Sequence, residues 1–182
     1  MKKIWYLIIA IILIIIAIII FTSKPKKRAV LQFPTAIVIN NYTDAKLADT
    51  IIMTIVNKIL KYDTATFNVF YMPKVFNGDN IQIYGFITKV EYVNHTYNIY
   101  ISSKYKEYNI YSLLSHELVH FDQMEKGFLI VPSPSVSDKY NIWMNDTIHL
   151  FEVPYENREY EMDAFKRANS IESELKNILF HK

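Results

Sequence analysis

Hydrophobic residues are concentrated most strongly at the beginning of this 182-residue chain. Residues 4–21 form a run without any charged residue, Gly or Pro. As a helix this run would be roughly 27 Å long at 1.5 Å per residue, close to the hydrocarbon thickness of a bilayer. Basic residues lie on both sides of the run. The pattern predicts a single transmembrane helix within an N-terminal anchor of residues 1–28.

Two features of this anchor have alternative interpretations. A cleavable signal peptide also contains an apolar run, although it is usually shorter and ends in small residues. The basic residues at 24–28 outnumber those before the run, and the positive-inside rule then favours a cytoplasmic location for the rest of the chain. A very short basic N-terminus can also stay inside while the rest is exported, so both sides of the membrane remain open.

After residue 28 the period of the hydrophobic positions alternates between helical and extended. Helical spacing appears three times, and a segment rich in β-branched and aromatic residues lies between the first two helices. The helices are expected over residues 45–61, 107–126 and 157–179, the strands over 67–72, 81–93 and 97–102, and a short hairpin within 140–153. The order of helix, antiparallel sheet and two further helices predicts a single α+β domain over residues 29–182.

Composition narrows the classes of partner. The chain has no Cys, which excludes disulfides and thiolate metal ligands. Its formal net charge is +2, but six basic residues precede Ala29, and residues 29–182 carry 14 basic against 18 acidic side chains, a net charge of −4. This acidic domain without a basic stripe argues against nucleic-acid binding. The basic segment beside the hydrophobic run favours anionic lipid headgroups as its partners.

The segment YSLLSHELVHFDQ (residues 111–123) lies inside the second predicted helix and carries candidate chemistry. His116 and His120 are four residues apart, so their imidazoles lie on one helical face and can reach one ion. Zinc binds neutral imidazole, and a catalytic zinc site keeps one position open for water. Glu117 could accept the proton of that water as it attacks a carbonyl carbon. The alternative is a helix whose two His side chains are exposed or paired with neighbours.

A third ligand is expected from the last predicted helix, whose beginning is rich in acidic residues. The buried face of this helix is defined by a 4-3-4-3 spacing of Ala164, Ala168, Ile171, Leu175 and Ile178. At 100° per residue, Glu161 falls about 40° from the centre of this face and Glu159 about 160°. A buried carboxylate needs a cationic partner, which favours Glu161 as the ligand. A later or rotated helix would make Glu159 the ligand, with Asp163 as its neighbour.

With these residues the chain resembles gluzincin-type zinc metallopeptidases, in which an HExxH helix supplies two His and a general base and a later helix supplies a Glu. Several families of this group carry the second motif as E-x-x-A, which is matched here by Glu161 and Ala164. The resemblance implies a zincin-like fold and a membrane-anchored zinc peptidase that cleaves peptide bonds with metal-activated water. It implies His116, His120 and Glu161 as zinc ligands and Glu117 as the base.

The resemblance also implies a substrate site, and the chain departs from the pattern of the family at one position. The strand expected over 97–102 would be an edge strand that pairs with an extended peptide substrate. Many relatives have Asp or Asn directly after the Ala of the second motif, where this chain has Phe165; Asp163 or Asp122 could orient a His instead. His149 and Tyr155 are candidates to stabilise an oxyanion. The alternative function is a non-catalytic, membrane-tethered binding or scaffold protein with a peptidase-like fold.

Overall fold

The computed structural model describes residues 36–72, 75–76, 82–103, 109–132 and 140–181. The chain divides between Gln32 and Phe33 into two units, and every described residue belongs to the second unit. The predicted transmembrane run, residues 4–21, lies outside the described residues. Among the helices that the structure describes, none is both long and apolar enough to cross a bilayer.

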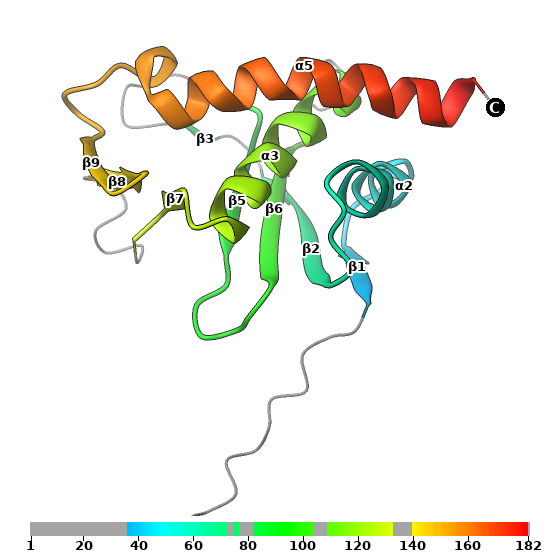
Figure 1. Ribbon diagram of the computed structural model, residues 1–182. Coiled ribbons are helices and arrows are strands. Elements are labelled where there is room, and N and C mark those ends of the chain that lie inside the picture. Colours follow the sequence, from blue (N-terminus) through cyan, green and yellow to red (C-terminus); the bar gives the residue numbers. More distant parts are fainter. Residues whose placement is uncertain (1–35, 73–74, 77–81, 104–108, 133–139, 182) are drawn as a thin grey trace, which may run out of the picture. The chain divides into compact units, whose positions relative to one another are not determined.

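The described residues form an α+β fold (Figure 1). In chain order the elements are β1 (Ile37–Asn41), α2 (Ala48–Met53), the π-helical segment η1 (Thr54–Ile59), β2 (Ala65–Met72), β3 (Val75–Phe76), β4 (Gln82–Ile83), β5 (Gly85–Lys89), β6 (Thr96–Ser102), α3 (Ile110–Glu125), β7 (Leu129–Ile130), β8 (Tyr140–Trp143), β9 (Asp146–His149), the 3₁₀ segment η3 (Tyr155–Asn157) and α5 (Glu159–Phe180). The α+β class predicted from the sequence is confirmed.

The main sheet has the strand order β1-β2-β6-β5 and is mixed, so the prediction of an antiparallel sheet was wrong. Strand β1 pairs parallel to β2, and β2 pairs parallel to β6. Strands β1 and β2 are joined through α2 and η1, and such a helical crossover returns the chain in the same direction. Only β5 is antiparallel, because a turn connects it directly to β6.

The assignment of the edge strand was also wrong. Strand β6, expected at the edge as residues 97–102, has β2 on one side and β5 on the other. Strand β5 is the edge of the four-stranded sheet. It occupies only part of the strand expected over 81–93, since β4 pairs with β3 in a separate small sheet and Tyr92 lies in a turn with positive φ. Strand propensity alone does not determine which segments pair.

Helix α3 is buried on two sides, which places its residues at the centre of the domain. Helices α2 and α3 contribute to one core with the inner face of the sheet, and α5 packs against α3 (Figure 1). Phe121 of α3 makes edge-to-face contacts with Phe67 of β2 and Tyr97 of β6, with ring centroids 5.1 and 4.9 Å apart. These three side chains are fully buried. They hold α3 at a fixed position across the sheet.

The ends of the helices follow local sequence signals. Asn109 caps α3, because its side chain accepts a hydrogen bond from the backbone N–H of Tyr111. Gly127 follows the helix with φ of +71°, as expected for a glycine that terminates it. The first helix begins at Ala48, three residues later than predicted, and Leu47 is exposed.

The predicted hairpin within residues 140–153 is confirmed as β8 and β9. Met144 and Asn145 connect these strands, and both have positive φ, the conformation that a tight two-residue hairpin turn requires. Strand β7 adds a third strand to this small sheet. Trp143 of β8 is buried in the core, so the hairpin is fixed to the domain close to the N-terminal end of α5.

Candidate metal centre

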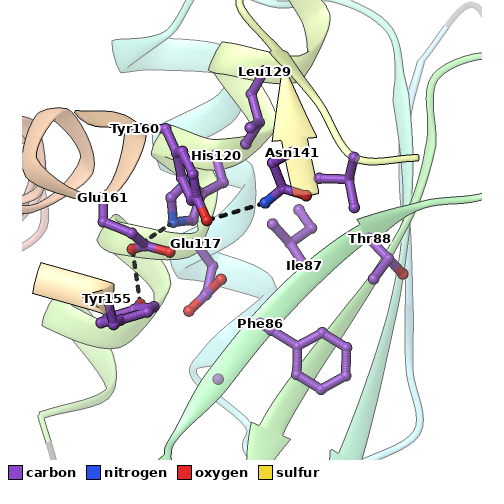
Figure 2. A pocket seen from close by; sticks show the side chains of 12 residues that line it. Phe86, Ile87, Thr88, Glu117, His120, Leu129, Asn141, Tyr155, Tyr160 and Glu161 are labelled. Atoms are coloured by element: carbon purple, nitrogen blue, oxygen red, sulfur yellow. Dashed lines mark hydrogen bonds and ion pairs between the residues drawn. The ribbon is translucent and has the colours of Figure 1, made fainter. Parts of the chain in front are cut away.

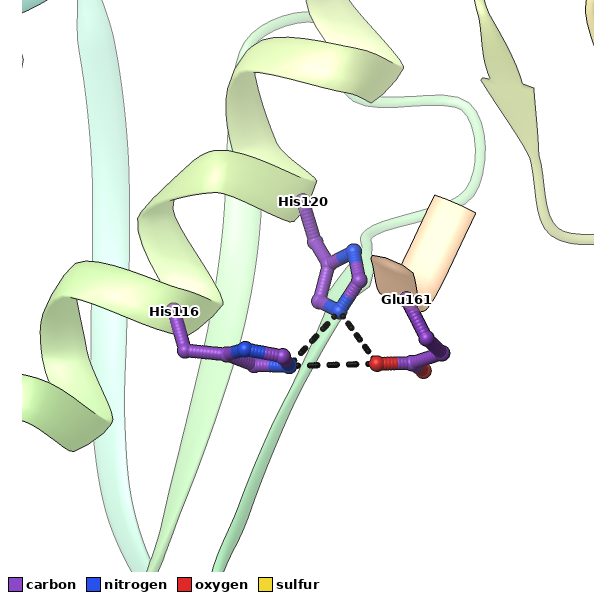
Figure 3. A group of neighbouring side chains, drawn as sticks. All are labelled: His116, His120 and Glu161. Atoms are coloured by element: carbon purple, nitrogen blue, oxygen red, sulfur yellow. Dashed lines mark hydrogen bonds and ion pairs between the residues drawn. The ribbon is translucent and has the colours of Figure 1, made fainter. Parts of the chain in front are cut away.

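Helix α3 presents both His residues of the HExxH segment toward the beginning of α5. His120 is buried and His116 is partly buried. Their Nε2 atoms lie 3.2 Å apart, as expected for side chains one helical turn apart on the same face. The two ring planes are almost perpendicular, at 86°, and both Nε2 atoms point at the same region of space (Figure 3).

The third member of this group is Glu161 of α5. Its Oε2 lies 3.1 Å from Nε2 of His116 and 3.3 Å from Nε2 of His120 (Figure 3). The three ligand atoms therefore form a nearly equilateral triangle. Among the described residues, His116, His120 and Glu161 form a group that could hold a metal ion.

The two glutamates weighed as third ligand have opposite orientations. Glu161 is 6% exposed, whereas Glu159 is on the solvent side of α5. The orientation expected from the helical period is confirmed, since Ala164 and Ala168 are buried on the same face as Glu161. The structure thus brings Glu161, and not Glu159, to the His pair.

Charge and burial act in opposite directions on this group. Burial alone would lower the pKa of His120, but the charge of Glu161 and hydrogen bonds raise it to about 9. Burial alone would raise the pKa of Glu161, but His120 and His116 lower it to about 2. At neutral pH the protein without a cation thus carries an imidazolium beside a carboxylate. A metal ion that binds here must displace a proton, as metal ions generally do at imidazole ligands.

Glu117 points into a cavity of about 200 Å³ beside the His pair (Figure 2). Burial raises the pKa of this carboxyl group, although His116 and His120 counteract the shift. A raised pKa suits a general base, because a base is most effective when its pKa lies near the operating pH. The edge strand β5 forms the opposite wall of the cavity. Its Gly85 lies close to Glu117, because a Cβ atom added at Gly85 would be 3.1 Å from Oε1 of Glu117.

The second ring nitrogen of His120 is held by Gln123, a residue that the sequence analysis did not identify. Nδ1 of His120 lies 2.8 Å from Oε1 of Gln123. The amide NH₂ of Gln123 donates to the backbone oxygen of Tyr160 and to Oδ2 of Asp163, at 2.9 and 2.8 Å. Both of these groups accept hydrogen bonds, so Oε1 must face His120, whose Nδ1 therefore donates. Asp163 acts on His120 only through Gln123.

Asp122, the second residue that was expected to orient a His, does not do so. Asp122 faces away from the site, where it accepts hydrogen bonds from Tyr62, Lys126 and Arg167. Phe165 packs on the ring of His116, with centroids 4.5 Å apart. Nδ1 of His116 is buried and makes no hydrogen bond to any residue that the structure describes. An apolar ring, rather than a hydrogen-bonding side chain, thus contacts His116 from position 165.

Of the two candidates for oxyanion stabilisation, the structure brings Tyr155 to the site and leaves His149 outside. The Tyr155 hydroxyl donates to Oε2 of Glu161 at 2.8 Å and lines the same cavity as Glu117 (Figure 2). Burial and the neighbouring Glu161 raise the pKa of Tyr155, so its hydroxyl stays protonated. His149 is exposed on β9 and contacts Tyr140.

One of the site residues that the sequence analysis did not single out could have been found from its position in the chain. Gln123 follows His120 by three residues and therefore lies on the same face of α3. Gly85 and Asn141, which also line the cavity, carry no local signal that separates them from other residues. No protein-family model, curated protein or solved structure matches this chain, and the function has to be inferred from the site itself.

Proposed function

We propose that the protein is a membrane-anchored zinc peptidase that hydrolyses peptide bonds. The observation behind this proposal is the convergence of two imidazole nitrogens and one carboxylate oxygen, 3.1–3.3 Å apart. They lie next to the buried carboxyl group of Glu117, which does not belong to this group of three ligand atoms. Two ligand atoms bound to one tetrahedral zinc ion lie roughly 3.3 Å apart. The donor set of two His and one Glu also occurs in catalytic zinc sites.

In this proposal His116, His120 and Glu161 hold the ion. A bound zinc ion supplies a Lewis acid, which lowers the pKa of water and polarises a carbonyl group. Gln123 fixes the proton of His120 on Nδ1 and leaves the lone pair of Nε2 for the ion. His120 and Glu161 would bind the ion from the wall of the cavity that Glu117 also lines.

Glu117 is the proposed general base. Its carboxylate accepts a proton from water as the oxygen attacks the carbonyl carbon of the scissile bond. As the C–N bond breaks, the same carboxyl group gives this proton to the leaving nitrogen. The second proton of the water also passes to the amine, so the products are a carboxylate and an ammonium group. The Tyr155 hydroxyl donates to Glu161 in this structure, and we propose that it turns to donate to the carbonyl oxygen, on which negative charge develops.

Strand β5 is the proposed docking edge for the substrate. It pairs with β6 on one side only, and four of its residues, from Gly85 to Thr88, line the cavity beside Glu117. An extended peptide can add to such an edge through backbone hydrogen bonds. The absence of a side chain at Gly85 lets the substrate backbone approach Glu117 closely.

The proposal is tested with the full-length protein and three single variants. We expect the parent protein to bind about one equivalent of zinc and to cleave peptides from a broad library. Glu117→Gln should retain zinc and lose about 10²- to 10⁴-fold in turnover, because the base is removed and the ligands are not. His116→Ala should lose the zinc. Glu159→Gln, which changes an exposed glutamate of α5, is the matched control and should change neither property.

Two results would contradict the proposal. One is cleavage by Glu117→Gln at the rate of the parent protein. The other is purification of the parent protein with iron(II), which accepts the same donors in other enzymes. Zinc binding without cleavage of any library peptide would favour the non-catalytic binding protein instead.

A further inference from the structure

Asn141 of β8 lines the cavity, and one end of its side-chain amide has no hydrogen-bond partner within the described part of the chain. The residue is only 8% exposed. Its Nδ2 donates to the hydroxyl of Tyr160 at 3.0 Å, while its Oδ1 is buried and has no hydrogen-bond partner among the described residues. Figure 2 shows this oxygen on the side of the amide that faces away from Tyr160.

The Asn141 amide would lack one hydrogen-bond partner among the described residues whichever way its nitrogen and oxygen are assigned. If nitrogen and oxygen were exchanged, Tyr160 could donate to the oxygen, and the NH₂ group would then lack a partner. Buried polar groups are almost always hydrogen-bonded, and one that is not is unfavourable. An unpartnered amide in the wall of a cavity is therefore suited to a ligand that brings a hydrogen-bonding group.

The surroundings of Asn141 restrict the chemistry of that ligand. Ile87 and Leu129 lie near Asn141 in the cavity wall (Figure 2), and Val131 is a further apolar residue of the lining. Apart from two tyrosines, the ionisable side chains that line the cavity are His120, Glu117 and Glu161, which belong to the candidate metal centre. A charged group beside Asn141 would thus lack a counter-ion, and burial of an unpaired charge is strongly unfavourable. A purely apolar group would leave the amide unpaired.

We infer that this end of the cavity binds a substrate side chain with an apolar stem and an uncharged, hydrogen-bonding tip, and that Asn141 selects it. The class comprises glutamine, asparagine, serine and threonine at one position beside the cleaved bond. The inference rests on the proposed peptidase function. It assigns specificity to a residue that contacts neither the ion ligands nor Glu117 through any hydrogen bond that the structure records.

The test compares cleavage sites in one peptide library for the zinc-loaded full-length protein, two variants of Asn141 and one control variant. For the parent protein we expect enrichment of the uncharged polar class at a single position next to the bond. Asn141→Leu should shift this position to aliphatic residues, with at least about a tenfold loss in the ratio of glutamine to leucine substrates. Asn141→Asp should shift it to lysine and arginine. Asn169→Leu, on the exposed face of α5, is the matched control and should keep the parent profile.

The inference is wrong if the parent protein prefers charged or apolar residues at each position next to the bond, or if all four proteins share one profile. Failure of the peptidase proposal gives a different result, namely no cleavage by zinc-loaded protein. In that case the role of Asn141 is tested by binding of the same library to immobilised Glu117→Gln protein. If the bound peptides are enriched in the uncharged polar class, and this enrichment disappears with the double variant Glu117→Gln/Asn141→Leu, the role of Asn141 is supported. If both proteins retain the same peptides, the role is overturned. Zinc content of each variant reports on its folding.

Discussion

At the scale of single residues, the centre depends on how each imidazole is held. His120 is fixed by a buried amide whose other hydrogen bonds leave it one orientation. His116 is held instead by contact with the ring of Phe165. Removal of a hydrogen-bond partner of a metal-bound His typically lowers metal affinity by about 10- to 100-fold. The two His should therefore respond differently to changes in their surroundings.

Gln123→Met tests the role of Gln123 as a positioning residue. Methionine fills a similar volume but cannot accept the Nδ1 proton of His120, so we expect about a tenfold loss of zinc affinity. The measurements are zinc competition with a chelator and the NMR signal of the His120 Nδ1 proton in the zinc-bound protein. That signal should be sharp in the parent protein and exchange-broadened in the variant.

A purely structural role for Gln123 would lower the melting temperature and leave the Nδ1 signal unchanged. Asp163→Asn provides the intermediate case. It keeps an acceptor for the Gln123 amide and should lower zinc affinity less than Gln123→Met does.

At the scale of elements, the site is assembled where α3 lies between the edge strand β5 and the beginning of α5. The close approach of α3 and β5 depends on Gly85, because an added Cβ would be 2.8 Å from Cδ1 of Leu113 and 3.1 Å from Oε1 of Glu117. Both contacts are shorter than ordinary van der Waals separation between side chains. Gly85 thus determines how close Glu117, the proposed base, lies to strand β5, the proposed docking edge for the substrate.

Gly85→Ala should reduce turnover more than metal binding. The new methyl group forces Leu113 or Glu117 to move, and a small displacement of a catalytic group has a large effect on rate. We expect zinc affinity within about twofold of the parent protein and about a 10- to 100-fold lower turnover. Zinc titration and peptide hydrolysis on the same preparation measure both. Equal losses in the two measurements would contradict a specific effect on Glu117.

At the scale of the whole domain, the proposed ion connects two helices that lie far apart in the sequence. His116 and Glu161 are separated by 45 residues, and the segment between them forms the small sheet of β7, β8 and β9. Helix α5 covers α3 through a row of small and aliphatic residues, from Ala164 to Leu175. The ion would hold the end of α5 at which this row begins.

Chelation of the ion should therefore lower the stability of the whole domain. A ligand present at about 1,000 times its dissociation constant stabilises the folded state by about 4 kcal/mol. For a domain of this size we expect a decrease in melting temperature of roughly 5–15 °C on addition of a strong chelator. Calorimetry of the full-length protein measures the change. Glu161→Ala is the control, since its melting temperature should not respond to the chelator.

The local geometry of the centre follows from residues that are neighbours in the chain. The four-residue spacing of His116 and His120 and the orientation of Glu161 follow from the period of a helix, which depends only on neighbouring residues. The hairpin of β8 and β9 and the end of α3 at Gly127 are equally local. Each of these features can be predicted without any tertiary contact.

Tertiary contacts determine which strand lies at the edge of the sheet and which side chains complete the site. The antiparallel main sheet and the edge position of residues 97–102 were wrong, because strand propensity is similar for the segments that form β2, β5 and β6 and pairing depends on distant contacts. Gln123, Gly85 and Asn141 gained their roles from neighbours on other elements. Helical period is a property of adjacent residues, whereas pairing and cavity walls arise when the chain folds back on itself.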